Sequence, residues 1–179
     1  MKPDIAPQAL LDTIDADTML REVQDWAAIN TGTANIEGLD RMAGILADAF
    51  SVLPGDVELI DPATVTAISA EGREFEKPHG RHMVLRVRPD AERRFVLTGH
   101  MDTVFPVDHP FQEVSWIDDD TINGPGTADM KGGLDVILHA LKTFETMECA
   151  RRVGYDVMIN SDEETGSLAS RALIEELAR

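Results

Sequence analysis

The second half of the chain alternates between strand and helix patterns, and this alternation limits the folds that are possible. Residues His82–Arg88 alternate as in a strand with one buried and one partly wet face, and Phe95–Leu97 is a compact apolar run typical of a central strand. Apolar side chains at helical spacing predict a helix from Met130 to about Met147. A buried strand over Val153–Ile159 and an amphipathic helix over Ser167–Arg179 follow. The succession predicts an α/β layer structure whose sheet is at least partly parallel.

The first half of the chain is expected to supply two more helices and two short strands. Asp17–Ile29 places its apolar side chains on one helical face, and Ile36–Leu53 follows the same i, i+3, i+4 rule until Pro and Gly end it. Thr33 or Asn35 is the candidate cap for the second helix. Two short β-rich runs come next, Val57–Ile60 and Thr64–Ile68.

A single folded unit is expected over residues 16–179, after a weakly ordered segment at residues 1–15. The length of 179 residues suits one domain of about 100–200 residues. The final helix reaches Arg179 without a Gly or Pro stop signal. We therefore expect the chain to be the N-terminal portion of a longer catalytic domain.

The charge of the chain excludes several classes of partner. There are 33 acidic and 16 basic residues, for a net charge of −17. Such a chain would be repelled by nucleic acid and by anionic membrane surfaces, so neither is expected as a partner. Cys149 is the only cysteine, which rules out an intrachain disulfide and a cysteine-based zinc site. A reducing, cytoplasmic location is expected.

The first chemistry-bearing segment follows the predicted strand Phe95–Leu97. His100 and Asp102 lie two residues apart, so in extended backbone their side chains point to the same side. This arrangement suits a metal-bound imidazole whose other ring nitrogen is held by a carboxylate. Taken alone, the pair is more simply explained as an ordinary surface histidine beside a surface aspartate.

The second segment, GPGTADMKGG at residues 124–133, places one carboxylate among four glycines just before a strongly periodic helix. Asp129 lies at or near the helix start, so an ordinary helix cap is one interpretation. Helix N-termini also bind anions, which makes a phosphate cradle a second possibility, although Asp129 would repel a phosphate. A metal-binding carboxylate is the third interpretation. Lys131 is expected either at the surface or as an aid to packing near Asp129.

The third segment places Asp162, Glu163 and Glu164 directly after the apolar strand Val153–Ile159. Open α/β sheets bind their ligands at the carboxyl ends of strands, which is where these acids are predicted to lie. Adjacent carboxylates repel each other unless a cation is near or one of them is protonated. A solvated acidic turn is the alternative.

Together the three segments offer an imidazole and several carboxylates at strand ends. Mixed nitrogen and oxygen ligands suit Zn²⁺, Mn²⁺ or Co²⁺. A histidine, a bridging carboxylate and a terminal carboxylate are the components of a two-metal hydrolytic centre. The conjunction of all three segments favours such a centre over three unrelated surface features.

The three segments also resemble a known family. VLTGHMDTVFP, NGPGTADMKGGL and INSDEETGS are similar to the signature blocks of the zinc-dependent aminoacylase, acetylornithine deacetylase and carboxypeptidase G superfamily of metallopeptidases. The similarity is closest to the glutamate carboxypeptidase branch. By this resemblance His100 and Glu164 each ligate one of two Zn²⁺ ions, and Asp129 bridges them. Glu163 is then the general base, and Asp102 orients or tunes His100.

The resemblance implies a three-layer α/β catalytic domain with a mixed, largely parallel sheet flanked by helices. In the family this domain is interrupted by a smaller lid or dimerisation domain, which we do not expect within these 179 residues. Family members also supply two further metal ligands later in the chain. We therefore expect little or no turnover from these 179 residues alone, and a homodimer is a possibility for the full-length protein.

The reaction implied by the resemblance is hydrolysis of an amide bond in N-acyl amino acids or short peptides. Two other functions remain open at this stage. One is a non-catalytic module that retains a metallopeptidase fold. The other is a Mg²⁺-dependent phosphoryl-transfer enzyme that uses Asp129 and Glu164, although His100 as a ligand favours a softer metal.

Overall fold

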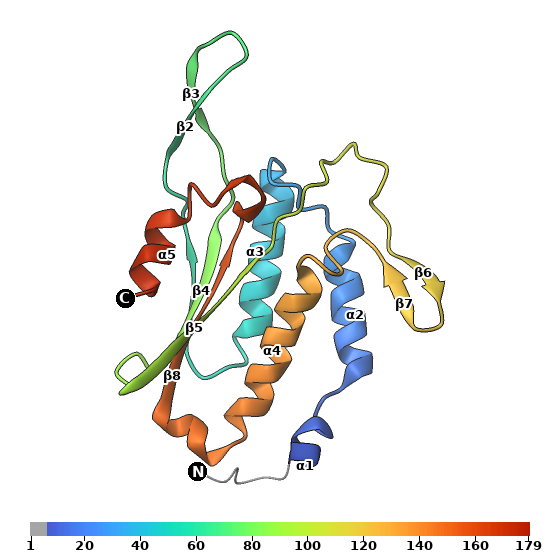
Figure 1. The fold of residues 1–179 in the computed structure, drawn as a ribbon, viewed down its shortest axis with the longest axis vertical. Helices are drawn as coiled ribbons and strands as arrows, with labels where there is room; N and C mark the ends of the chain where they lie inside the picture. The colour runs from blue at the N-terminus through green and yellow to red at the C-terminus, as the bar shows by residue number, and fades with distance from the viewer. Residues whose placement is uncertain (1–6) are drawn as a thin grey trace.

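A four-stranded sheet with the strand order β1-β4-β8-β5 forms the centre of the protein (Figure 1). The computed structural model describes residues 7–179. The strands of this sheet are β1 (Asp56–Ile60), β4 (His82–Val87), β5 (Arg93–His100) and β8 (Val153–Asn160). Strands β1 and β4, and β4 and β8, pair antiparallel, whereas β5 and β8 pair parallel, with His100 opposite Asn160. The parallel pair brings the carboxyl ends of β5 and β8 to the same edge.

The sheet is mixed as expected, but three details of the strand predictions are wrong. Only one of the three pairings in this sheet is parallel, so the sheet is not largely parallel within the described residues. Phe95–Leu97 belongs to β5, which is at the edge of this sheet, and Phe95 and Val96 are exposed. Strand β4 lies between two neighbours and buries both faces, including Val84, because protein covers it on both sides.

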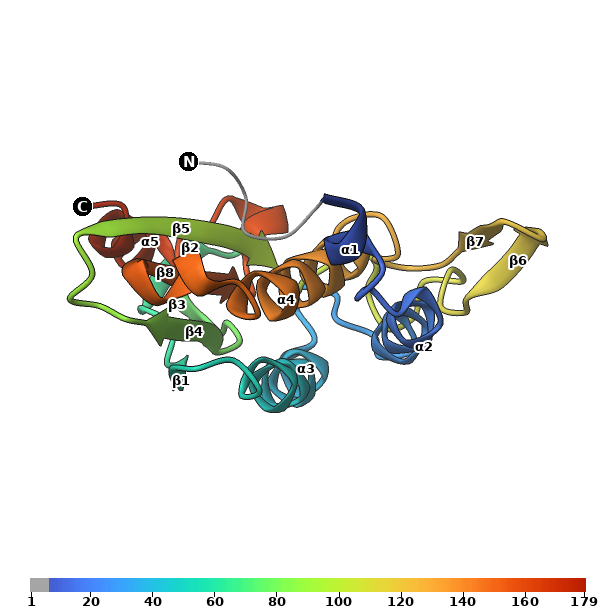
Figure 2. The same cartoon turned by 90° about the horizontal axis from the view of Figure 1, so that it is seen from below.

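Helices cover both faces of the sheet, which gives the expected three layers. The helices are α1 (Pro7–Leu11), α2 (Ala16–Ala27), α3 (Ile36–Phe50), α4 (Lys131–Glu145) and α5 (Arg171–Leu177). Helices α3 and α4 pack on one face, and α2 packs against α4 (Figure 2). Helix α5 lies on the other side of the strands (Figure 1), where its Ile174 lines a cavity with Met158.

The core forms between α3, α4 and one face of the sheet. Of the apolar positions predicted for α3, Met42, Leu46 and Phe50 are fully buried, and so is Leu39, which was not predicted. The side-chain oxygen of Asn35 accepts a hydrogen bond from the backbone N–H of Gly38 at 3.2 Å, so Asn35 rather than Thr33 caps this helix. Core residues of the strands come from alternate positions of β4 and β8: Met83, Leu85, Val87, Tyr155, Val157 and Ile159.

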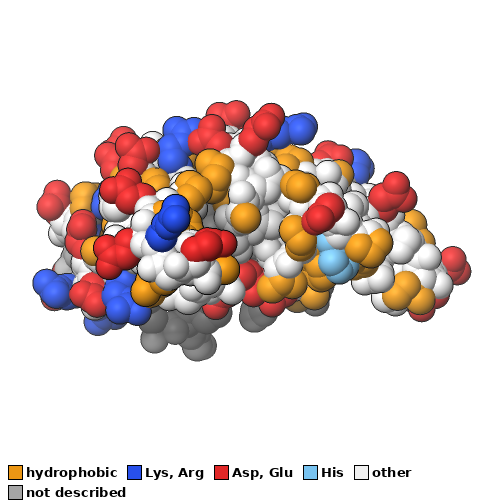
Figure 3. All heavy atoms as spheres, turned by 90° about the horizontal axis from the view of Figure 1, so that it is seen from above, with side chains coloured by type: hydrophobic (Ala, Val, Ile, Leu, Met, Phe, Trp, Pro, Cys, Tyr) orange, Lys and Arg blue, Asp and Glu red, His pale blue; other side chains and the backbone are white. Residues whose placement is uncertain are grey.

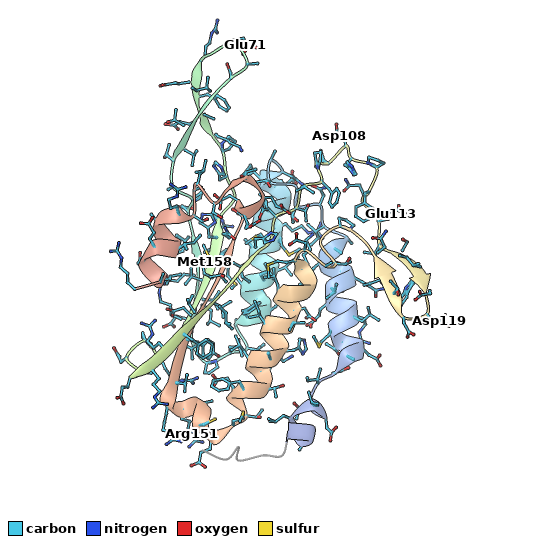
Figure 4. All side chains as sticks on the ribbon, in the orientation of Figure 1. Glu71, Asp108, Glu113, Asp119, Arg151 and Met158 are labelled. Carbon is cyan, nitrogen blue, oxygen red and sulfur yellow. The ribbon has the colours of Figure 1, made fainter. Side chains whose placement is uncertain are left out.

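Two hairpins extend beyond this layered body. One is formed by β2 (Val65–Ile68) and β3 (Glu74–Lys77), and the other by β6 (Ser115–Asp118) and β7 (Thr121–Asn123). Glu71 and Asp119 mark their two turns in Figure 4. Neither β3 nor the second hairpin was predicted, because their side chains are mostly exposed and the stretches lack an apolar alternation.

The remaining expectations concern the ends of the chain and membranes. Of the segment 1–15, residues 1–6 lie outside the described part of the structure, and Pro7–Leu11 forms the short helix α1. The final helix is shorter than predicted and covers Arg171–Leu177. Among residues 7–179, no helix combines the length and the apolar character needed to cross a membrane.

Candidate metal centre

The three segments singled out in the sequence meet beyond the carboxyl ends of β5 and β8. His100 is the last residue of β5, and Asp129 lies in the loop that leads into α4. Glu163 and Glu164 begin the short 3₁₀ helix η2 (Glu163–Thr165), which follows β8. Because β5 and β8 are parallel, the loops after both strands start at the same edge of the sheet. Figure 3 views the molecule from this end and shows carboxylates distributed over the face.

His100 is held at both ring nitrogens. Its Nε2 lies 3.0 Å from Oδ1 of Asp129, and its Nδ1 lies 3.0 Å from the backbone oxygen of Asp102 and 3.4 Å from Oδ1 of the same residue. Burial by itself lowers the pKa of His100, but the hydrogen bonds to Asp102 and Asp129 outweigh it and raise the pKa to about 9. In the metal-free chain the ring is therefore protonated at neutral pH.

Asp102 ties the end of β5 to the loop after β8. Its side chain is fully buried. Its carboxylate accepts a hydrogen bond from Thr33 Oγ1 at 2.8 Å and one each from the backbone N–H groups of Glu163 and Glu164 at 3.2 Å. A single buried carboxylate thus fixes the position of His100 and of η2 at the same time.

The remaining acids converge on the Nε2 side of His100. A nitrogen of His100 and one carboxylate oxygen each of Asp129 and Glu164 all lie within 4.8 Å of one another. Oε2 of Glu163 lies 3.8 Å from Nε2 of His100. The side chains of Asp129 and Glu163 are 77% and 53% exposed, so the cluster is open to solvent on one side.

The donor set of this cluster fits a divalent metal ion. Burial raises the pKa of Glu164, and the negative charges of Asp129, Asp102 and Glu163 raise it further, while His100 lowers it. Carboxylates crowded in this way favour a nearby cation. One imidazole nitrogen with carboxylate oxygens is a ligand set that Zn²⁺, Co²⁺ and Mn²⁺ accept. The cluster therefore has both the charge and the ligand atoms for such an ion.

The loop before α4 directs Asp129 towards His100 instead of towards the helix. The N-cap of α4 is Met130, and no side chain caps this helix, so the helix-cap interpretation of Asp129 is wrong. Gly126 has a φ of +77°, a conformation that favours glycine, and the loop turns there. Lys131 is fully buried, and its Nζ donates to the backbone oxygens of Trp26 at 3.0 Å and Ile29 at 2.7 Å. It is a packing residue and not a surface one.

Two contributors to this arrangement were missing from the sequence analysis. Thr33 was considered only as a helix cap, although its hydroxyl holds Asp102. Asp162 was grouped with the acids of the site, but its buried carboxylate accepts from the backbone N–H of Ala169 and from Oγ of Ser170, each at 2.7 Å. Asp162 therefore braces the loop after β8. In the sequence, the signal for this role is the presence of two serines, Ser167 and Ser170, shortly after Asp162.

The protein thus has a mixed α/β fold. A candidate metal centre of one imidazole and several acids lies at the carboxyl ends of two parallel strands. Residues 96–179 match the model of peptidase family M20/M25/M40. The chain is 30% identical over 167 residues to carboxypeptidase G2 of Pseudomonas sp. strain RS-16, covering 93% of this chain and 37% of the relative. Residues 96–179 therefore resemble a domain of peptidase family M20/M25/M40.

Solved structures show the same fold at lower identity. The structure of human carnosine dipeptidase 1 matches with a TM-score of 0.74 and 21% identity, over 98% of this chain and 38% of that one. The M20 family metallo-carboxypeptidase Sso-CP2 of Sulfolobus solfataricus matches with a TM-score of 0.66 and 23% identity, over 91% and 34% of the two chains. The present chain thus spans little more than a third of the length of these relatives.

Proposed function

We propose that this chain supplies part of the active site of a metal-dependent peptidase that hydrolyses an amide bond in N-acyl amino acids or short peptides. The observation that carries the proposal is the convergence of ligand atoms from His100, Asp129 and Glu164 within 4.8 Å of one another. The match of residues 96–179 to peptidase family M20/M25/M40 and the similarity to carboxypeptidase G2 support a hydrolytic reaction on peptide-like substrates.

In this proposal His100, Asp129 and Glu164 would hold two zinc ions, with Asp129 shared between the ions and His100 and Glu164 each a ligand of one. Co²⁺ and Mn²⁺ suit the same donors. Metal ions held there would supply polarisation of the substrate carbonyl and a lower pKa for the attacking water. The exposed carboxylate of Asp129 supports the bridging role, because it lies within 4.8 Å of a ligand atom of both His100 and Glu164.

Glu163 is the proposed general base. Its half-exposed carboxylate lies next to the ligand cluster, 3.8 Å from Nε2 of His100, with no hydrogen bond that would hold it elsewhere among those found for residues 7–179. It takes a proton from the attacking water and returns it to the leaving amine. Asp102 is a positioning residue, since it contacts Nδ1 of His100 and the backbone of Glu163 and not the open face of the cluster.

The described residues offer three protein ligands for a two-metal centre, which is fewer than two tightly held ions require. We therefore propose that turnover needs further ligands from outside these 179 residues, and that the isolated chain binds metal weakly and is nearly inactive. Three further expectations remain predictions. They are the absence of nucleic acid and membrane partners, a homodimer of the full-length protein, and a cytoplasmic location.

The metal assignment is tested by titrating Zn²⁺ into the metal-free chain and into the His100→Ala and Glu164→Gln variants with a competing chromophoric chelator. Loss of either ligand is expected to weaken binding at this cluster at least tenfold. An exposed acid outside the cluster, Asp119→Asn, is the matched control and is expected to leave the affinity unchanged. Equal affinity in all four proteins would refute the assignment.

The role of Glu163 is tested in the full-length protein. Glu163→Gln keeps the size of the side chain but removes its basicity, so we expect unchanged metal content by elemental analysis and a loss of at least about 10²-fold in kcat. Loss of metal together with a retained rate of hydrolysis would show that Glu163 is a ligand and not the base.

A further inference from the structure

A second cluster of metal-ligand side chains lies between α2 and α4, away from the carboxyl ends of the strands. It consists of Glu22 from α2 and Asp135 and His139 from α4, and we call it the α2–α4 cluster. The two helices run side by side in both Figure 1 and Figure 2. Asp135 and His139 are four residues apart on one helix, so their side chains share a face that turns towards α2.

The geometry of the α2–α4 cluster is close to that of an ion site. One ligand atom from each of the three residues lies within 4.8 Å of the others. Nε2 of His139 is 2.7 Å from Oε2 of Glu22 and 3.6 Å from Oδ1 of Asp135. Donor atoms at about 2.1 Å from a tetrahedral ion are about 3.4 Å apart. Asp135 and His139 already have this spacing, and Glu22, which is 31% exposed, needs only a small side-chain movement to reach it.

Asp135 supplies an independent indication that a ligand is expected here. Its side chain is 1% exposed, and neither of its carboxylate oxygens has a hydrogen-bond partner among the described residues. Burial raises the pKa of Asp135 to about 7, and the neighbouring carboxylate of Glu22 adds to this effect, whereas Lys142 opposes it. An unsatisfied buried carboxylate is costly, and a second acid beside it increases the cost unless a cation is bound.

We propose that Glu22, Asp135 and His139 bind one divalent transition-metal ion of the zinc or cobalt class, at a site separate from the cluster at the strand ends. One nitrogen and two carboxylate donors suit these borderline metals. The fourth coordination position is left for water. His139 also lines a surface cavity of about 450 Å³ together with Thr18 and Lys142, so the cluster borders solvent on the His139 side.

An ion at this position would fasten α2 to α4. The same two helices are already joined at the start of α4, where Lys131 donates to backbone oxygens at the end of α2. Asp129 lies two residues before Lys131. The α2–α4 site is therefore placed to hold the helix that follows the Asp129 loop, which is a structural role and not a catalytic one.

The experiment removes two ligands of the cluster at the strand ends, His100 and Glu164, and asks whether a metal site remains. In the His100→Ala, Glu164→Gln double variant of this chain, we titrate Co²⁺ and record the visible d–d absorption. We expect the titration to show one ion per chain at the α2–α4 cluster. X-ray absorption is expected to show nitrogen and oxygen ligands that include one imidazole. Adding His139→Gln, or separately Glu22→Gln, is expected to lower the affinity at least tenfold.

Asp25→Asn on α2 is the matched control, since Asp25 is an exposed acid on the same helix, and it is expected to leave Co²⁺ binding unchanged. Far-UV circular dichroism confirms that each variant is folded. His139 is buried, so His139→Gln could prevent folding. Glu22 is partly exposed and its replacement is expected to be tolerated, so Glu22→Gln still tests the site. No Co²⁺ binding in the double variant, or binding that is indifferent to Glu22 and His139, overturns the proposal. Either of these results would leave a proton shared by Glu22 and Asp135 as the explanation of the buried, unpaired carboxylate.

Discussion

Replacing Asp102 by asparagine changes one atom in the carboxylate that connects β5 to the loop after β8. In the structure one of its oxygens accepts from the backbone N–H of Glu163, and the other accepts from Thr33 Oγ1 and from the backbone N–H of Glu164. The amide group of asparagine has a single acceptor oxygen. In either orientation of the amide, an N–H donor therefore faces the N–H of Glu163 or Glu164.

The cost of the Asp102→Asn substitution can be worked out from these contacts. One hydrogen bond to a charged acceptor is lost, which is worth about 1.5–3 kcal/mol, and a backbone N–H is left without a partner at a buried carboxylate position. The surviving bonds weaken because their acceptor is no longer charged. We expect a decrease of about 3 kcal/mol in the free energy of unfolding, which corresponds to roughly 6–12 °C in Tm for a chain of this size.

The assay is urea and thermal unfolding of the metal-free chain, followed by circular dichroism in the presence of a chelator. Asp119→Asn, at the exposed turn between β6 and β7, is the control and is expected to change the stability by less than about 0.5 kcal/mol. A double-mutant cycle with Thr33→Val isolates the bond between Thr33 and Asp102. If Asp102→Asn is as stable as the wild type, Asp102 does not hold the two loops together and its proposed positioning role is wrong.

Two further predictions concern the helices. The pKa of Asp135 is raised on folding, so the native state binds more protons than the unfolded state between about pH 4 and 7, and its stability falls as the pH rises through this window. Asp135→Asn should therefore stabilise the metal-free chain at pH 8 by about 1 kcal/mol or more and lose this advantage below about pH 4, as measured by urea unfolding; a difference independent of pH would contradict this. Phe50 is fully buried in the core, so Phe50→Ala should cost about 3–5 kcal/mol in the same assay, and a cost below about 1 kcal/mol would mean that the core is not packed around it.

Local patterns in the sequence were sufficient for most helices and buried strands. The apolar positions of α3 and α4 recur at helical spacing because one face of each helix meets the core, and this regularity is visible without coordinates. The edge position of β5 was not predictable, because its apolar run resembles that of a central strand. The β6–β7 hairpin was missed because exposed side chains carry no periodic signal.

The sequence by itself determined which residues are the candidates for metal chemistry. His100, Asp129 and Glu164 were identified because their types and their positions at strand ends suit one another, and parallel strands bring such positions together. Only the tertiary structure decided what surrounds them. Asp102 is held by Thr33, and Glu22 meets Asp135 and His139, because helices and loops that are distant in the sequence pack side by side. Contacts of this kind depend on how elements dock, and docking leaves no pattern within any single segment.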